Sequence, residues 1–113
     1  MKLQSSGKLL RIFVSENDRH AGQPLYEWII RQAEARKMAS ATVLRGLEGF
    51  GARHHLHTAK VLRMSSDLPI VIEIADTADK IQNFYTLLAS VLEEGIVTLE
   101  NIEISFFRKG PES

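Results

Sequence analysis

The sequence predicts an α+β domain of the ferredoxin-like type, in which two helices cover one face of a four-stranded antiparallel sheet. Two amphipathic segments alternate with four segments rich in β-branched and aromatic residues, in the order β-α-β-β-α-β. The chain has 113 residues, enough to bury a core without a metal or a disulfide. We therefore expect a single domain over residues 8–109, with flexible ends at residues 1–7 and 110–113.

The predicted strands are short apolar runs bounded by turn residues. Pro69 stands near the start of its run, where a strand tolerates proline. The residues between the second and third strands are predicted to form a loop and part of a ribbon, followed by a turn at residues 65–67. We expect strands within residues 9–14, 42–45, 68–74 and 97–107, and the ribbon in residues 59–64.

Both predicted helices have recognisable ends. The first spans about residues 24–37. Pro24 suits the first helical position, because a backbone N–H there would have no hydrogen-bond acceptor within the helix and proline has no N–H. The second follows the capping side chains of residues 76–79 and is expected to stop at Gly95. Its apolar stripe consists of Ile81, Phe84, Tyr85, Leu88, Val91 and Leu92.

Strand alternation predicts which side chains lie beneath the helices. These are Leu10, Ile12 and Val14, then Ile70, Ile72 and Ile74, then Ile102, Ile104 and Phe106. The opposite face then carries Arg11, Phe13, Val71, Glu73, Glu103, Ser105 and Phe107. Arg11 in the central strand, flanked by Glu73 and Glu103, predicts a ladder of ion pairs. The large apolar side chains beside it favour a face covered in a symmetric oligomer, with a solvated face as the alternative.

Composition excludes several classes of function. Lys plus Arg and Asp plus Glu both number 14, so no net charge attracts nucleic acid or an anionic membrane surface. The absence of cysteine removes thiol catalysis and thiolate metal sites, and favours a cytoplasmic location. Residues 1–7 lack the apolar core of a signal peptide, and no apolar run approaches the ~20 residues of a membrane helix. We expect no membrane insertion.

The most informative segment is residues 46–51, which contain Gly46, Gly49 and Gly51 at the end of a predicted strand. Glycines there allow positive φ or a close approach of the backbone to a ligand or another strand. Consecutive N–H groups around residues 49–51 are suited to an anion. The alternative is that these glycines form a β-bulge or permit close packing between subunits.

Several motifs resemble the PII-type signalling superfamily, and within it an uncharacterised PII-like family. The superfamily pattern appears as Thr42-Val43, Gly49-Phe50-Gly51, Arg53 and His57-Thr58. The narrower family pattern appears as Glu16 and Asp18; Gly22, Pro24, Leu25 and Tyr26; residues 42–51; and Asp67-Leu68-Pro69. The resemblance spans about residues 9–107.

This resemblance implies a homotrimer with ligand clefts between subunits, and a signalling loop over residues 51–67. PII proteins bind adenine nucleotides, but Ala52 stands in place of an arginine and residues 93–96 lack a phosphate loop, so a smaller nucleotide such as AMP is favoured over ATP. The regulated partner is expected to be a membrane transporter or an enzyme. The implied ligand-binding residues for a small anionic metabolite are Arg45, Gly46, Glu48, Gly49, Phe50, Gly51, Arg53, His57, Thr58, Arg108 and Lys109.

Three alternatives stay open. The first is a ligand-free interaction module that partners a membrane transporter. The second is a metal site at His54, His55 and His57, since imidazole suits zinc or copper. The third is a small enzyme that uses Glu16, His20 or Glu48. The sequence does not contain a nucleophile at a catalytic spacing from a base and an orienting group. We therefore expect a protein that is not an enzyme and has no catalytic residues. Tyr26 and Trp28 are expected in the core or an interface.

Overall fold

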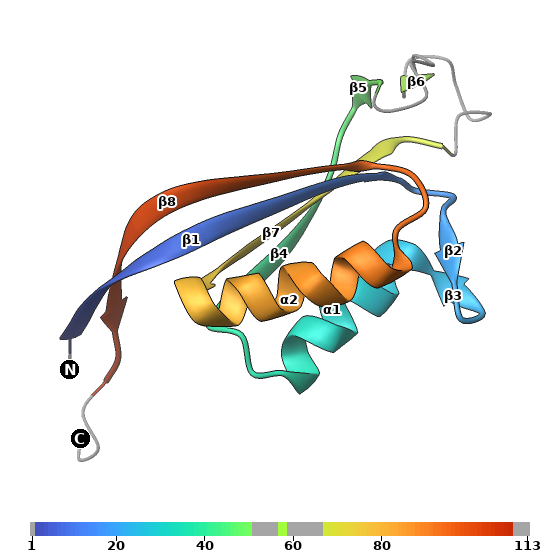
Figure 1. The fold of residues 1–113 in the computed structure, drawn as a ribbon. Helices are drawn as coiled ribbons and strands as arrows, with labels where there is room; N and C mark the ends of the chain where they lie inside the picture. Colours follow the sequence, from blue (N-terminus) through green and yellow to red (C-terminus); the bar gives the residue numbers. More distant parts are fainter. Residues whose placement is uncertain (1, 51–56, 59–66, 110–113) are drawn as a thin grey trace.

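A single four-stranded sheet forms the centre of the computed structural model, which describes residues 2–50, 57–58 and 67–109 (Figure 1). All neighbouring strands are antiparallel, in the order β4-β7-β1-β8. The strands are β1 (Lys2–Ser15), β4 (Ser40–Arg45), β7 (Pro69–Thr77) and β8 (Ile96–Phe107). The predicted ferredoxin-like fold is confirmed, with the first strand between the third and the fourth.

Helices α1 (Leu25–Ala35) and α2 (Ala78–Val91) lie against the same face of this sheet (Figure 1). Two short strand pairs flank it. β2 (Arg19–His20) pairs with β3 (Gln23–Pro24), and β5 (Glu48–Gly49) pairs with β6 (His57–Thr58). The ribbon and turn predicted in residues 59–66, and the predicted C-terminal tail, lie outside the described residues.

The core lies between the helices and the covered face of the sheet. The predicted alternation is confirmed in β1 and β7, where every second side chain is buried. Burying a large aliphatic side chain completely contributes about 1.5–3 kcal/mol, so this layer supplies most of the stability of the domain. The fully buried large side chains, each less than 2% exposed, are Leu10, Ile12, Ile29, Ile72, Ile74, Ile81, Phe84 and Leu88.

The helix ends differ in part from the prediction. α1 begins directly after Pro24, which occupies the N-cap position. α2 ends at Val91, because Leu92 already has extended dihedral angles (φ −71°, ψ 127°), so the prediction that Gly95 stops this helix is wrong. Gly95 instead lies in the turn into β8 with φ +142°, where an added Cβ would lie 3.0 Å from the carbonyl oxygen of Phe13.

Asp76 is the one charged residue with a buried side chain among the described residues. Its Oδ2 accepts a hydrogen bond from the Ala39 N–H at 2.8 Å and lies 3.5 Å from Lys80 Nζ, while its Oδ1 accepts one from the Thr77 N–H at 2.6 Å. The capping segment predicted before α2 therefore also holds the α1–β4 connection.

The side of β8 that faces the helices differs from the prediction. Leu10 pairs with Leu99 and Ile12 with Val97, so Val97 and Leu99 point to the covered face. The prediction that Ile102, Ile104 and Phe106 lie beneath the helices is wrong, because they have the opposite parity. The prediction rested on the alternation of apolar and polar residues in the second half of β8, and most of that half lies beyond the core.

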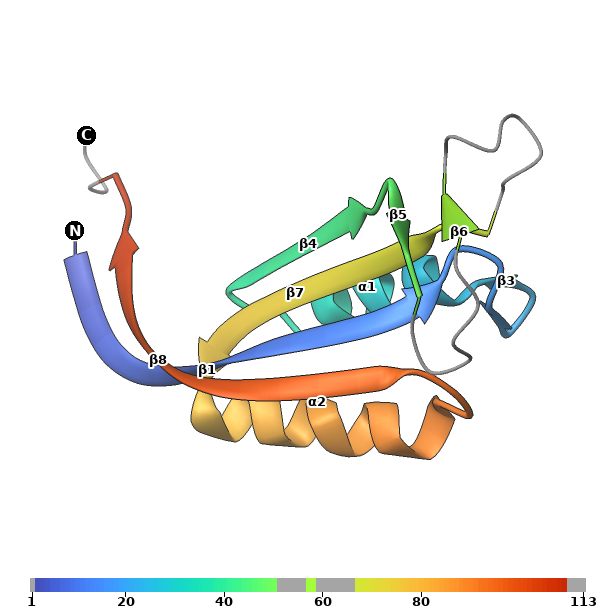
Figure 2. The same ribbon diagram turned by 90° about the horizontal axis from the view of Figure 1, so that it is seen from above.

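We call the face away from the helices the open face (Figure 2). Strand register arranges its side chains in rows that cross all four strands. One row is apolar: Leu44, Val71, Phe13 and Ile96. The next row is polar: Thr42, Glu73, Arg11 and Thr98.

The predicted ladder at Arg11 exists, but with a different glutamate on one side. Arg11 Nε lies 2.9 Å from Glu73 Oε2, and Arg11 Nη1 lies 3.3 Å from Glu100 Oε1. The hydrogen bond to Glu73 raises the pKa of the Arg11 guanidinium above its ordinary value. Glu103, the partner predicted from the assumed parity, lies on the other face of β8.

β1 and β8 continue beyond the rest of the sheet as a two-stranded arm, which we define as residues 2–6 and 103–107 (Figures 1 and 2). Pairing between β1 and β7 begins at Gly7, so residues 2–6 of β1 pair with β8 alone. The structure therefore places residues 2–7 in a strand, whereas the sequence predicts a flexible end there. Within the described residues, neither helix has the length and apolar character to cross a bilayer.

Candidate functional site

The glycine-rich segment lies at the end of the sheet opposite the arm. β4 ends at Arg45, and the chain then forms β5, which pairs with β6 so that Glu48 lies opposite Thr58 and Gly49 opposite His57. The structure thus brings together the glycine segment and the His57-Thr58 motif, which the resemblance placed in one site. Gly51 and Arg53 lie outside the described residues.

The described glycines of this segment, Gly46 and Gly49, both lie close to Pro69. An added Cβ on Gly46 would lie 2.9 Å from Pro69 Cγ, and one on Gly49 would lie 3.3 Å from the same atom. The Gly46 N–H also donates a hydrogen bond of 2.8 Å to the Pro69 carbonyl oxygen. Neither glycine has positive φ, so the alternative of close packing applies here, although the contact is within one chain.

Arg45, a predicted ligand-binding residue, is paired with Glu16. Arg45 Nη2 lies 2.9 Å from Glu16 Oε2, and Glu16 Oε1 accepts a hydrogen bond of 3.3 Å from the Leu68 N–H. The Glu16 N–H donates to the Leu68 carbonyl oxygen at 2.9 Å. Glu16 therefore connects the loop after β1 to the end of β4 and to the start of β7, next to the glycine segment.

Asp18 forms the neighbouring turn. Its Oδ2 accepts a hydrogen bond of 3.0 Å from the Ser15 N–H, and its own N–H donates to the Ser15 carbonyl oxygen at 3.1 Å. The Asp18 side chain therefore holds the turn that follows β1.

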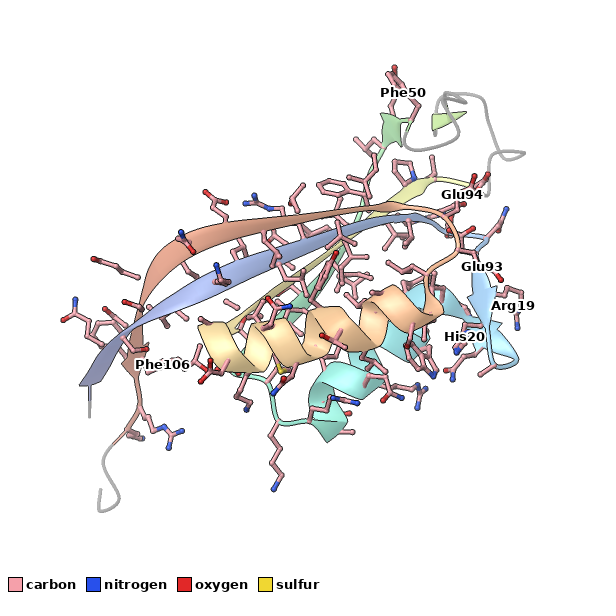
Figure 3. The ribbon with its side chains drawn as sticks, in the orientation of Figure 1. Arg19, His20, Phe50, Glu93, Glu94 and Phe106 are labelled. Atoms are coloured by element: carbon pink, nitrogen blue, oxygen red, sulfur yellow. The ribbon has the colours of Figure 1, made fainter. Side chains whose placement is uncertain are left out.

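The glycine segment itself carries exposed apolar side chains. Leu47 is 77% exposed and Phe50 is 63% exposed. Phe50 points away from the body of the domain (Figure 3). Exposed apolar side chains of this kind are common on surfaces that bind ligands or proteins.

Two predicted site residues lie far from this segment within the chain. Arg108 and Lys109 follow β8, so they lie at the tip of the arm, whereas Phe50 lies at the other end of the molecule (Figure 3). A single chain does not bring these cations to the glycine segment. A site that uses both must take them from different subunits.

The structure also contains a cavity that the sequence did not predict. It has a volume of about 730 Å³ and lies between the β1–β2 turn and the C-terminal end of α2. Its lining includes Arg19 and His20 on one side and Glu93 and Glu94 on the other (Figure 3). In the sequence, the two adjacent glutamates that follow an amphipathic helix are the signal from which this cavity could have been predicted. Of the three residues in the enzyme hypothesis, the cavity lining includes His20 and neither Glu16 nor Glu48.

His20 is held at the edge of this cavity by Trp28. Their ring centroids lie 4.6 Å apart at an interplanar angle of 71°, an edge-to-face contact. Trp28 also packs against the core with Tyr26, as predicted. Arg19 Nη2 donates a hydrogen bond of 2.9 Å to the Gly22 carbonyl oxygen and so braces the β2–β3 turn.

The metal hypothesis falls mostly on residues outside those described, because His54 and His55 are not among them. Within the described residues, no three His, Cys, Asp or Glu side chains come close enough together to hold a metal ion. The metal site at His54, His55 and His57 stays a prediction.

The fold is that of PII-like proteins, and solved structures of such proteins share it. CPII, a nitrogen regulatory PII-like protein from Thiomonas intermedia K12 solved with ADP, AMP and bicarbonate, matches with a TM-score of 0.58 and 16% identity, over 90% of this chain and 91% of that one. A Thermus thermophilus protein described as a PII-like signaling protein matches with a TM-score of 0.62 and 12% identity, over 89% and 91%.

Sequence comparison identifies the particular family. Residues 7–104 match the family DUF190, described as "Uncharacterized ACR, COG1993", and the chain belongs to it. A UPF0166 protein of Aquifex aeolicus is 35% identical over 99 residues, which cover 88% of this chain and 93% of that protein. A UPF0166 protein of Methanocaldococcus jannaschii is 26% identical, covering 86% and 90%. The resemblance to an uncharacterised PII-like family is confirmed.

Proposed function

We propose that this protein is a PII-like regulator that assembles as a homotrimer and binds an adenine nucleotide such as AMP at clefts between subunits. The observation that carries the proposal is the glycine segment held on Pro69, with Gly49 paired to His57 and Phe50 exposed beside it. PII-like neighbours with this fold have been solved with ADP and AMP. Arg108 and Lys109 at the arm tip would then contribute from a neighbouring subunit.

In this proposal the protein binds its nucleotide in the cytoplasm and does not convert it chemically. Nucleotide occupancy would change the conformation of the loop after Gly49, which a membrane transporter or an enzyme would recognise. Incubation with ATP, ADP or AMP should yield no new product by chromatography. A product that accumulates in proportion to protein concentration would contradict this part of the proposal.

Native mass spectrometry combined with a thermal-shift series tests the binding site. We expect the purified protein to have the mass of three subunits, and AMP or ADP to raise its melting temperature. Phe50→Ala should reduce that rise, because it removes an exposed ring at the segment without touching the core. Tyr85→Ala, an exposed aromatic position on α2, is the matched control and should leave the rise unchanged. Failure of AMP, ADP and ATP to shift the melting temperature would contradict nucleotide binding.

A second candidate function is a ligand-free interaction module. The exposure of Leu47 and Phe50 favours it, since adjacent exposed apolar side chains often mark a protein interface. In that case a partner would be lost in pull-downs with Leu47→Ser and Phe50→Ser, while no nucleotide changes the melting temperature.

A further inference from the structure

The cavity beside His20 is lined by residues outside the glycine segment. Its lining comes from parts of residues 17–25 and 90–94. Of the predicted ligand-binding residues that the structure describes, none lines it. Its volume of about 730 Å³ falls within the range of small-molecule sites, about 300–1,000 Å³. Leu25 and Val91 add apolar surface to a lining that is otherwise mostly polar. The cavity is therefore a candidate for a second ligand.

The end of α2 that lines the cavity favours a cation. Carbonyl groups in the last turn of a helix form the negative end of its dipole, which attracts positive charge. α2 has no basic residue in its last turn, and Glu93 and Glu94 follow its end at Val91. Two carboxylates at this end oppose the usual preference for basic residues. Departures of this kind from a local rule are typical of functional sites.

The facing wall carries a cation that is held in place (Figure 3). Arg19 Nη2 donates its 2.9 Å hydrogen bond to the Gly22 carbonyl oxygen, and the His20 ring packs against Trp28. A guanidinium has five N–H donors, so this one contact leaves donors for an acid group of a ligand. The two walls of the cavity thus have opposite charge.

The turn that connects β2 to β3 is strained beside the cavity. His20 pairs with Gln23, which leaves Ala21 and Gly22 as the two central residues of the turn, with φ +52° and φ +78°. Glycine or asparagine is usual in such a turn, because a Cβ is disfavoured at positive φ. Ala21 therefore keeps a methyl group in the cavity lining at a cost to the turn.

The charges of the lining define a class of ligand. Arg19 suits an acid group, whereas the carboxylates of Asp18, Glu93 and Glu94 outnumber it and suit cationic groups. Within residues 2–50, 57–58 and 67–109, no three His, Cys, Asp or Glu side chains are grouped closely enough for a metal ion, so an organic cation is favoured. A small molecule with one acid group and more than one amino or guanidino group matches both walls.

We propose that this cavity binds a basic amino acid, with the carboxylate of the ligand at Arg19 and its distal ammonium or guanidinium group at Glu93 and Glu94. This site is distinct from the nucleotide site of the proposed function and does not depend on it. A chain with both sites would respond to two classes of metabolite.

Isothermal titration of the purified full chain with L-lysine and L-arginine tests the site. We expect saturable binding of at least one of them. The matching decarboxylated amine, cadaverine or agmatine, lacks the acid group, and norleucine or norvaline lacks the distal cation. Each analogue should bind about tenfold more weakly or worse, because it loses a charged hydrogen bond. Equal affinity for the amino acid and its decarboxylated amine would contradict the role of Arg19.

Variants assign the two walls. Glu93→Gln combined with Glu94→Gln should weaken binding of the amino acid about tenfold or more. Both side chains are exposed, so the melting temperature without ligand should be unchanged. Glu34→Gln, at an exposed position on α1, is the matched control and should bind normally. Arg19→Gln should remove the preference for the amino acid over its decarboxylated amine, a change that a role of Arg19 in the turn alone would not produce.

Two results would overturn the proposal for this cavity. One is the absence of binding by both L-lysine and L-arginine. The other is unchanged affinity in the combined Glu93→Gln and Glu94→Gln variant. The thermal shift with AMP is measured on the same unmodified protein. Its absence while a basic amino acid still binds would contradict nucleotide binding and leave the cavity site supported.

Discussion

The two faces of the sheet show how differently one set of strands can be used. On the covered face, Leu10, Ile12, Ile72 and Ile74 are all 0% exposed. The open face alternates an apolar row with a polar row, and Phe13 and Arg11 lie on it only two residues apart. The covered face is buried by the helices of the same chain, whereas, within the described residues, no helix covers the apolar row of the open face.

The largest expected effect is on the covered face. Ile72→Ala removes a fully buried side chain and should lower the free energy of unfolding by about 2–5 kcal/mol, measured by urea denaturation. This loss should not depend on protein concentration. Val71→Ala is the matched control, because the adjacent residue on β7 points to the open face. Its loss should be smaller and should vary with concentration. Equal, concentration-independent losses would contradict the difference between the faces.

The next effect tests whether the apolar row on the open face is an interface. Phe13→Asp places a charge at the centre of this row and should weaken assembly by roughly 2 kcal/mol or more per contact. Sedimentation velocity at micromolar concentration should show a shift toward the monomer. Thr98→Asp, in the adjacent polar row, should have less effect. An unchanged assembly in Phe13→Asp would leave the open face as a solvated surface.

The smallest effect concerns the polar row. The side chains of Arg11 and Glu73 are 38% and 34% exposed in one chain, and pairs of that kind contribute about 0–1 kcal/mol. Arg11→Met should therefore cost little in the Phe13→Asp background, and the loss should shrink further at high salt. In the otherwise native protein the loss should be larger, because a covered pair is screened less. The same small loss in both backgrounds would mean that assembly does not cover this row.

The sequence was sufficient to predict the fold because the strongest signals are local. The alternation in residues 70–74 and the helical spacing around residues 81–88 each fix a buried face without knowledge of the rest of the chain. β8 was harder, because its first residues, Ile96, Val97, Thr98 and Leu99, show no clear alternation. Their orientation depends on register with β1, which is a long-range property.

The candidate site was predicted less completely for the same reason. The grouping of Gly49 with His57 followed from a family pattern, and the structure places the two residues opposite each other. The contacts of Gly46 with Pro69 and of Arg45 with Glu16 join residues that are distant in sequence. No local sequence pattern predicts such contacts. The cavity beside His20 likewise forms only when the end of α2 meets the β1–β2 turn.

Pro69 has a consequence for how a ligand signal would travel. It is the first residue of β7, it pairs with Ser15 of β1, and the next residue, Ile70, belongs to the core. The Gly46 N–H donates to its carbonyl oxygen, and an added Cβ on Gly46 or Gly49 would approach its ring, so the backbone at Gly46 is tied to the start of a central strand. Under the proposed function, a response to nucleotide that leaves the core intact would leave Gly46 in place, and the exposed ring of Phe50 is the side chain expected to report it.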